Sequence, residues 1–289
     1  SNMEVSIKAP AKINLALDIL SKRPDGYHEV EMIMQTINLY DFINIKLNYH
    51  KDINLDCKLD VLEDKKNNTA YKAAKAFFEF TKINNPGIDI KVIKNIPQSA
   101  GLAGGSADAA GVLVGLNNIF NANLKDCDFV KIGSTIGADV PFSILGGTMV
   151  ATGIGTTLRK ISSLSDCYIV LVKPSISVCT KEAYEKSDAL KSEKIFNIND
   201  LELAIKNSDI NKISKLIFNK FEMVMNLDEV KYIKEFAINM GALNSCMSGS
   251  GPSVFSIFSD KEKAQQCVSA FKDKYKDVFL CNPIKNGAV

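Results

Sequence analysis

Four short segments carry residues whose types and spacing could do chemistry. In PAKINL, residues 10–15, an ammonium and an amide stand two residues apart among apolar neighbours. Side chains alternate along a strand, so Lys12 and Asn14 should face the same way and together suit an anion or a polar ligand. A lysine kept on an edge strand for solubility explains the same residues without any function, and it is the more common case for such a segment alone.

The second segment, IPQSAGLAGGSADAA at residues 96–110, is rich in glycine and opens a helix. Glycines let backbone N–H groups approach a ligand closely, and a helix N-terminus offers free N–H donors and the positive end of its dipole. We expect Ser106 to cap this helix, with Asp108 in its first turn. The segment lacks the GxxxxGK[ST] pattern of a P-loop and the GxGxxG pattern of a dinucleotide-binding loop. Its three glycines, two serines and alanine-rich helix start nevertheless favour a phosphate cradle over an ordinary turn.

The other two segments place polar residues in apolar or glycine-rich surroundings. Asp139 lies in GADVPF, residues 137–142, just past an expected helix end, and should be partly buried. Buried carboxylates are rare unless they are paired or functional. A capping aspartate before proline explains Asp139 about equally well. The loop MSGSGP, residues 247–252, favours a tight hairpin, and its glycines would also allow contact with an anion or with the other loop.

The elements that must position these segments follow from hydrophobic periodicity. Aliphatic and β-branched runs predict strands over 5–9, 13–20, 30–39, 42–47, 88–93, 168–173, 253–258 and 278–281. Helical spacing predicts helices over 68–82, 106–120 and 126–136, further helices up to Gly241, and one capped by Asp260. The turn RPDG at residues 23–26 separates the second and third strands. We therefore expect an α+β protein with two domains, residues 1–160 and 161–289.

Composition excludes several classes of function. The 289 residues include 46% hydrophobic and 24% charged residues, as in a soluble globular enzyme. A formal charge of +2 gives no reason to expect nucleic acid or a membrane as partner. Two histidines exclude a histidine-rich zinc site. Seven scattered cysteines are expected to be reduced and to act as small hydrophobes. Without a membrane-length apolar run or a signal peptide, we expect a cytoplasmic protein.

In this order and spacing, the segments resemble the GHMP kinase superfamily. Three of them match its signature regions, namely the N-terminal strand with its lysine, the glycine-rich phosphate loop and the C-terminal glycine loop. PAKINL, RPDGYH at residues 23–28 and GADVPF are similar to the members that phosphorylate the 2-hydroxyl of a cytidine diphosphate-linked alcohol in the non-mevalonate isoprenoid pathway. The resemblance runs from residue 8 to about 258. It implies an N-terminal domain like the second domain of ribosomal protein S5 and a ferredoxin-like C-terminal domain.

The resemblance also implies a cleft between the domains and a role for each matching position. Lys12 and Asp139 would be the catalytic pair. The positions that would bind ATP, with Asn68 near the adenine, are Pro97, Gly101, Leu102, Ala103, Gly104, Gly105, Ser106 and Asn68. The positions that would bind the substrate are Asn14, Tyr27, His28, Thr180 and Tyr184, with the two tyrosines on opposite faces of a cytosine and His28 near its polar edge. ATP would come with Mg²⁺, whose ligands are left open with Ser106 as a candidate.

Three alternatives are weighed against this interpretation. Other members of the superfamily, such as homoserine or mevalonate kinases, act on acceptors without a nucleotide, and Tyr27 and His28 after the turn argue against them. An ATP sensor without catalysis would need the loop but not Lys12 and Asp139. Nucleic-acid binding by the S5-like half is disfavoured by the near-neutral charge. The expected partners are ATP and the cytidine diphosphate-linked substrate, with the chain a monomer or a weak homodimer.

Overall fold

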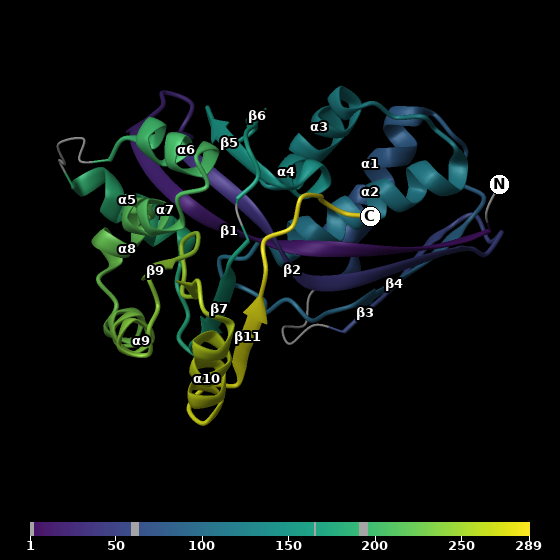
Figure 1. The fold of residues 1–289 in the computed structure, drawn as a ribbon. Coiled ribbons are helices and arrows are strands. Elements are labelled where there is room, and N and C mark those ends of the chain that lie inside the picture. Colours follow the sequence, from purple (N-terminus) through teal and green to yellow (C-terminus); the bar gives the residue numbers. More distant parts are fainter. Residues whose placement is uncertain (1–2, 59–63, 165, 191–195) are drawn as a thin grey trace.

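The computed structural model describes residues 3–58, 64–164, 166–190 and 196–289, which form two β-sheets with helices packed on each (Figure 1). The strands of the larger sheet are β1 (Glu4–Lys22), β2 (His28–Leu47), β3 (Ile53–Cys57), β4 (Ile88–Ile93), β5 (Thr148–Thr152), β6 (Thr157–Lys160) and β8 (Phe218–Asn219). Their order is β3-β4-β2-β1-β8, and β5 pairs with β2 and β6. The smaller sheet contains β7 (Tyr168–Lys173), β9 (Asn244–Met247), β10 (Val254–Phe258) and β11 (Asp277–Cys281).

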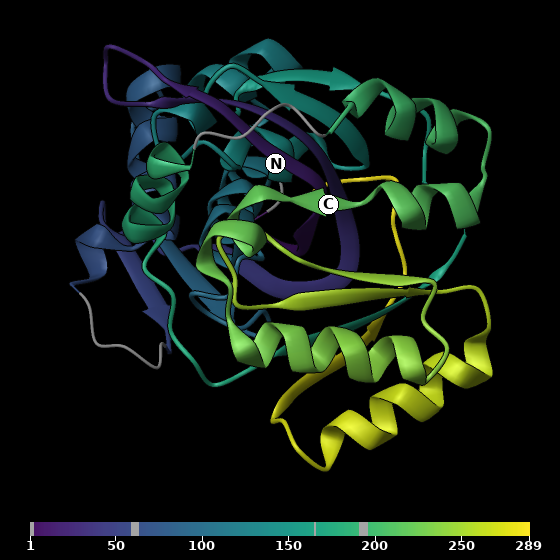
Figure 2. The same ribbon diagram turned by 90° about the vertical axis from the view of Figure 1, so that its left-hand side faces the viewer.

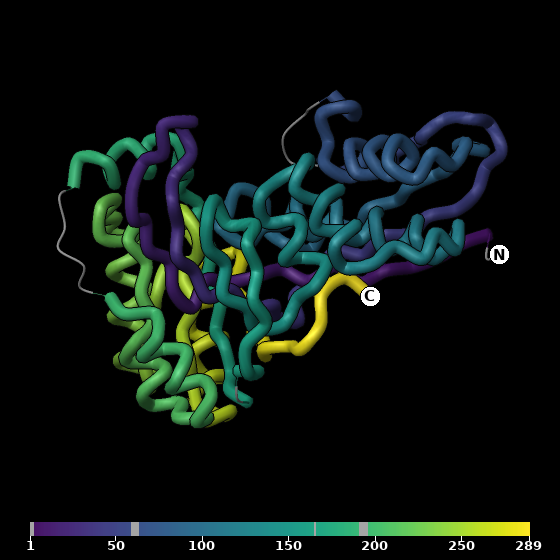
Figure 3. The backbone as a smooth tube through the Cα atoms, turned by 90° about the horizontal axis from the view of Figure 1, so that it is seen from above, coloured from purple at the N-terminus to yellow at the C-terminus, as the bar shows by residue number. Residues whose placement is uncertain are grey.

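β1 and β2 form one long antiparallel hairpin that extends from the N-terminal half to the helices of the C-terminal half (Figure 3). The four separate strands expected here were wrong, because Pro10 and Asp41 lie inside continuous strands. A register shift next to Pro10 lets the ladder continue past a residue that cannot donate a backbone hydrogen bond. β1 is paired with β2 on one side and with β8 at Ala16 and Leu17 on the other. Lys12 itself is buried, so the explanation of a lysine kept on an edge strand for solubility is wrong.

Four helices cover one face of the larger sheet (Figure 1): α1 (Thr69–Thr81), α2 (Gly104–Phe120), α3 (Asp126–Ser134) and α4 (Val140–Leu145). The short 3-10 turn Lys65–Asn67 precedes α1, and the Asn68 side chain caps α1 by accepting from the N–H of Ala70. α2 is buried over most of its length. A Cβ at Gly111 would lie 2.5 Å from Ile43, so the small residues of α2 serve close packing on the sheet.

Two helix boundaries differ from the prediction. α2 begins at Gly104 rather than at Ser106, and its N-cap is Ala103 in the left-handed conformation, with φ 56°. Asp108 therefore lies beyond the first turn, and it is buried. Sequence propensity disfavours glycine in a helix, but a Cβ at Gly104 would lie 3.1 Å from Ile96, so this position leaves little room for a side chain. α3 ends at Ser134, before Gly137, and is capped by Thr135.

The smaller sheet has the strand order β11-β7-β10-β9, and all its pairs are antiparallel. α9 (Asp228–Asn239) and α10 (Lys261–Lys272) pack on one of its faces (Figure 2), which gives the expected ferredoxin-like arrangement. Four more helices, α5 (Thr180–Ala189), α6 (Ile198–Lys206), α7 (Ile210–Leu216) and α8 (Lys220–Met225), lie between β7 and α9 in the chain. Asp260 caps α10 as predicted. The α+β class is thus confirmed, while the domain boundary after residue 160 stays a prediction.

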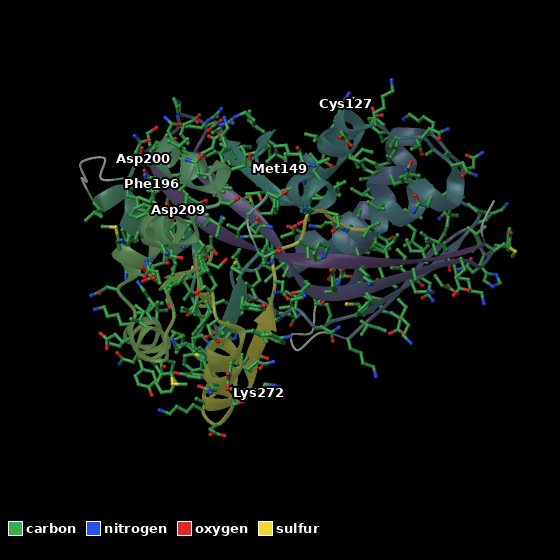
Figure 4. All side chains as sticks on the ribbon, viewed as in Figure 1. Cys127, Met149, Phe196, Asp200, Asp209 and Lys272 are labelled. Atoms are coloured by element: carbon green, nitrogen blue, oxygen red, sulfur yellow. The ribbon has the colours of Figure 1, made fainter. Side chains whose placement is uncertain are left out.

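All seven cysteines are free thiols. Four of them are buried and Cys57 is half-buried, but Cys127 on α3, labelled in Figure 4, and Cys179 are exposed. The expectation that every cysteine acts as a small hydrophobe is therefore wrong for these two. Among the residues described, no helix is long and apolar enough to cross a membrane.

Candidate active site

Lys12 lies in β1 with only 4% of its surface exposed. Its Nζ donates to Asn14 Oδ1 at 2.5 Å, which confirms that the two side chains share a face. Its backbone N–H donates to the carbonyl of Leu102 at 3.1 Å, so the strand is tied directly to the glycine-rich loop. Burial lowers the pKa of Lys12, and the charge of Asp139 partly offsets this effect.

Asp139 stands at the N-cap position of α4 and is half-buried, as expected. Its side chain makes no capping hydrogen bond, so capping alone does not explain this residue. Besides acting on Lys12, its charge adds to burial in raising the pKa of Tyr184. The carboxylate thus lies within electrostatic reach of the buried ammonium and of an aromatic ring from the other half of the chain.

The C-terminal glycine loop closes over the same side chains. Gly249 N–H donates to Asn14 Oδ1 at 2.9 Å, so this oxygen binds both the loop and Lys12. Ser248 Oγ donates to the carbonyl of Gly101 at 2.9 Å, and a Cβ at Gly101 would lie 2.1 Å from the carbonyl oxygen of Ser248. The loop is therefore both the hairpin between β9 and β10 and a close partner of the phosphate loop, as its glycines allowed.

Asn219 of β8 shapes this glycine loop, and the sequence analysis missed it. Its amide nitrogen donates to the carbonyls of Met247 and Gly249, at 2.7 and 2.9 Å, and it is almost fully buried. A single asparagine in an amphipathic stretch carries no recognisable signal, because only the return of β8 to the larger sheet brings it here.

A cavity of about 510 Å³ lies over the glycine-rich loop. The predicted positions that line it are Asn68, Pro97, Gly101, Ala103, Gly104, Gly105 and Ser106. Leu102 is buried beneath the loop and does not line the cavity. The lining residues that were not predicted are Asn67, Thr69, Lys94, Gln98, Ser99, Ala100 and Asp108. Ala103 adopts the left-handed conformation, which glycine tolerates more readily than alanine.

An ion cluster adjoins this loop, and two of its members, Lys94 and Asp108, line the cavity. Lys94 Nζ donates to Asp41 Oδ2 at 2.5 Å and to Asp108 Oδ2 at 2.9 Å. Asp41 Oδ1 also accepts from the backbone N–H groups of Asn95 and Ile96, which fixes the start of the loop. Burial opposes the charge on Lys94, but the two carboxylates outweigh it and raise its pKa. Burial and the neighbouring Asp41 raise the pKa of Asp108 well above its ordinary value.

A second cavity, of about 410 Å³, lies at the hairpin turn between β1 and β2. It is lined by Lys22, Gly26, Tyr27, His28, Ala138, Ile154, Lys181, Tyr184, Glu185 and Asp188. Its lining therefore comes from both halves of the chain, and it includes three of the five predicted substrate positions. Ala138 connects it along the chain to Asp139.

The aromatic residues of this cavity are arranged differently from the expectation. The ring of His28 stacks on Tyr184, with 4.5 Å between the centroids, so one face of Tyr184 is covered. His28 Nε2 is 2.7 Å from Asp188 Oδ1, a contact the sequence gave no means to foresee. Tyr27 is 61% exposed. Here Tyr27 offers the accessible ring, while His28 and Tyr184 form a packed wall.

Thr180 is the first residue of α5, whose N-cap is Cys179. Its hydroxyl lies 2.8 Å from the hydroxyl of Ser250 in the C-terminal glycine loop. Neither Thr180 nor Asn14 lines either cavity, but both are hydrogen-bonded to the C-terminal glycine loop.

No group of three or more His, Cys, Asp or Glu side chains that could hold a metal occurs among the described residues. Ser106 lies in the first turn of α2 and lines the loop cavity. A Cβ at Gly137 would lie 3.9 Å from its hydroxyl oxygen, so the glycine leaves space beside the hydroxyl. Magnesium commonly keeps waters and is held by few protein groups together with substrate phosphates, and this sparse donor set fits such an ion.

Comparison with known proteins identifies the family. Residues 68–147 match the family described as GHMP kinases N terminal domain, and residues 201–277 match GHMP kinases C terminal. A protein of Clostridium beijerinckii named 4-diphosphocytidyl-2-C-methyl-D-erythritol kinase is 46% identical over 97% of this chain and 100% of its own. A protein of the same name from Clostridium novyi is 43% identical over 96% of this chain and 99% of its own.

Solved structures agree with these relatives. The crystal structure of a 4-(cytidine 5'-diphospho)-2C-methyl-D-erythritol kinase superposes with a TM-score of 0.83 at 26% identity, over 99% of this chain and 100% of that one. Homoserine kinase from Cytophaga hutchinsonii gives a TM-score of 0.81 at 19% identity, over 100% and 97%, and shares the fold. The chain therefore belongs to the GHMP kinases, and among them to the family of 4-diphosphocytidyl-2-C-methyl-D-erythritol kinases.

Proposed function

We propose that the protein transfers the γ-phosphoryl group of ATP to the 2-hydroxyl of 4-diphosphocytidyl-2-C-methyl-D-erythritol, with ADP as the second product. Full-length relatives at 42–46% identity carry the name of that kinase. The observation that carries the proposal is that the Asp139 carboxylate acts electrostatically on the buried Lys12 ammonium. The backbone N–H of Lys12 is hydrogen-bonded to Leu102 of the glycine-rich loop, and Asp139 follows Ala138, which lines the aromatic cavity.

In this mechanism Asp139 accepts the proton of the acceptor hydroxyl as that oxygen attacks the γ-phosphorus. Its side chain is free of the capping hydrogen bond that would otherwise occupy it. The Lys12 ammonium stabilises the charge on the transferred group, and its hydrogen bond to Asn14 holds it in place. Phosphoryl transfer depends mainly on such positioning and electrostatic stabilisation.

The glycine-rich loop supplies the ATP site. The N-terminus of α2 has no side-chain cap, so the backbone N–H groups of residues 104–106 are available for phosphate oxygens. We assign Mg²⁺ to this site together with ATP, with Ser106 as its candidate protein ligand. Bound there, the ion would neutralise charge on the phosphates.

The aromatic cavity supplies the site for the cytidine end of the acceptor. Tyr27 provides an exposed ring on which a base can stack. The contact with Asp188 fixes the orientation of His28, leaving Nδ1 for a polar edge of the base. Thr180 and Asn14, which are hydrogen-bonded to the C-terminal glycine loop, complete this side of the site.

We further place the protein in the cytoplasm, as a monomer or weak homodimer with small-molecule partners only. Its seven free thiols are typical of a reducing compartment. Its formal charge of +2 offers no field that would attract a polyanion.

The proposal is tested by incubating the protein with Mg·ATP and one acceptor at a time, and measuring ADP. The acceptors are 4-diphosphocytidyl-2-C-methyl-D-erythritol, homoserine and mevalonate. We expect ADP only with the first. Equal turnover of homoserine or mevalonate would contradict the acceptor assignment, and ATP binding without ADP from any acceptor would indicate a sensor.

A further inference from the structure

Residues 282–289 leave β11 and run back over the N-terminal half, where they touch three elements (Figure 1, yellow). On β2, the N–H of Ile284 donates to the carbonyl of Thr36 at 3.0 Å. On α4, the N–H of Ala288 donates to the carbonyl of Ser143 at 3.0 Å. On β1, Val289 and Lys8 exchange two backbone hydrogen bonds, at 2.7 and 3.0 Å. We call residues 282–289 the strap.

Thr36 is the point where the strap, the sheet and α4 meet. Its side chain is fully buried, and its hydroxyl donates to the carbonyl of Asn286 and accepts from the N–H of Gly147, both at 2.9 Å. Gly147 lies just after the end of α4. In the β1–β2 ladder, Thr36 stands directly opposite Lys12. One hydroxyl therefore joins the strap to the end of α4, next to the strand position that carries Lys12.

The strap also packs against the end of α4 with no side chain between the two backbones. A Cβ at Gly146 would lie 2.0 Å from the backbone nitrogen of Gly287. In turn, a Cβ at Gly287 would lie 2.2 Å from the carbonyl oxygen of Ile144. Both glycines are required by this approach, and Ala288 is buried in the main hydrophobic core beside them.

We propose that the strap and Thr36 hold α4 in register with β1, and thereby set the position of Asp139 relative to Lys12. Within α4, Ser143 N–H donates to the carbonyl of Asp139 at 3.0 Å, and Ser143 is the residue that Ala288 binds. The path from the strap to Asp139 is thus a single helical turn. The inference rests on the proposed function, in which these two side chains act together. Thr36 is a positioning residue, since it is fully buried and lines neither cavity.

The test is the pair Thr36→Val and Thr36→Ser. Valine keeps the shape of threonine but removes the hydroxyl, so Gly147 and Asn286 lose their shared partner. We expect Thr36→Val to lower kcat about tenfold, because a displacement near 1 Å at a reacting centre costs up to about a hundredfold. The dissociation constant of ATP should stay within about twofold, since the glycine-rich loop is not touched. Thr36→Ser should restore kcat.

A chain shortened by residues 286–289 gives a second measurement that does not depend on how well Thr36→Val folds. In that chain the hydroxyl of Thr36 still binds Gly147, but α4 loses its contacts with the strap. We expect the same fall in kcat at unchanged ATP affinity. A lower melting temperature with normal kcat in both proteins would overturn the positioning role.

Asp139→Asn, assayed in parallel, separates this inference from the proposed mechanism. If Asp139→Asn loses turnover while Thr36→Val and the shortened chain both keep it, the positioning role of the strap is wrong and the mechanism stands. If Asp139→Asn keeps turnover, the catalytic assignment itself fails.

Discussion

The cavity over the glycine-rich loop and the aromatic cavity are built in different ways. The cavity over residues 97–106 is shaped largely by the backbone of a glycine-rich loop, beside which Lys94 and Asp108 also line it and are joined to buried Asp41. The aromatic cavity is shaped by side chains, which come from the hairpin turn and from α5. A backbone site accepts many sequences as long as the loop keeps its path, whereas a side-chain site changes with each substitution.

This contrast explains how one fold can serve several acceptors. A homoserine kinase shares this fold at a TM-score of 0.81 with only 19% sequence identity. Phosphate binding by N–H groups and a helix N-terminus needs few particular side chains. Recognition of a base needs particular rings and hydrogen-bonding groups, so acceptor choice can change through few residues.

The largest effect should come from Asp139→Asn, because the proposed transfer from the first site to the second depends on this carboxylate. Removing a general base lowers kcat by roughly 10²–10⁴. Because the amide has the shape of the carboxylate, both KM values should change little. Steady-state kinetics with each substrate varied in turn checks this, and near-normal turnover would place the base elsewhere.

Gly105→Val should damage the backbone cavity selectively. The new Cβ would meet only Thr69, at 3.5 Å, so the folded protein can accept it. Its side chain would stand where the phosphates approach the first turn of α2. Loss of one hydrogen bond to a charged group corresponds to roughly a ten- to hundredfold rise in the KM for ATP. Gly105→Ala should give a smaller rise, and an unchanged KM for ATP in a normally melting Gly105→Val protein would contradict the cradle.

Tyr27→Ala should damage the side-chain cavity selectively. Stacking on a base is worth roughly 1–3 kcal/mol, which corresponds to about a five- to hundredfold rise in the KM for the cytidine substrate. The melting temperature and the KM for ATP should not change. Tyr49→Ala is the matched control, because Tyr49 is equally exposed, at 61%, and lines neither cavity. If the two variants behave alike, Tyr27 is only a surface residue.

The smallest effect concerns the pH dependence of kcat. Burial lowers the pKa of Lys12 from the ordinary 10.5, so its ammonium should be lost on the alkaline side below that value. kcat should fall as the ammonium loses its proton. In Lys12→Arg this alkaline fall in kcat should disappear, because a guanidinium stays charged.

Loss of the Lys12 ammonium affects stability and kcat in opposite directions as pH rises, which distinguishes it from unfolding. Between the lowered pKa and 10.5, the unfolded chain binds more protons at this site than the folded one, so Lys12 contributes greater stability as pH rises. Kinetics and melting curves over the same pH range therefore test the assignment. A fall in kcat that follows a fall in melting temperature would exclude Lys12 as its cause.

The sequence predicted most strands and helices, because their periodicity is local. The common face of Lys12 and Asn14 and the cap at Asp260 needed only strand alternation and helix-end chemistry. The start of α2 was misplaced, since the helix begins after Ala103 in the left-handed conformation and without the side-chain cap that Ser106 suggested. Contacts between distant residues had no local signal. Asp188 meets His28 across 160 positions, and Lys94 meets Asp41 across 53.

The pairing of β1 with β8 bears on how the protein can be made. β1 leaves the ribosome early, but Ala16 and Leu17 find their parallel partners only at Phe218 and Asn219. Until then that edge presents unpaired N–H and C=O groups, which can pair with strands of other chains. An N-terminal half produced alone would keep the edge open permanently. Aggregation of such a half, relieved by supplying the C-terminal half in trans, is the expected behaviour.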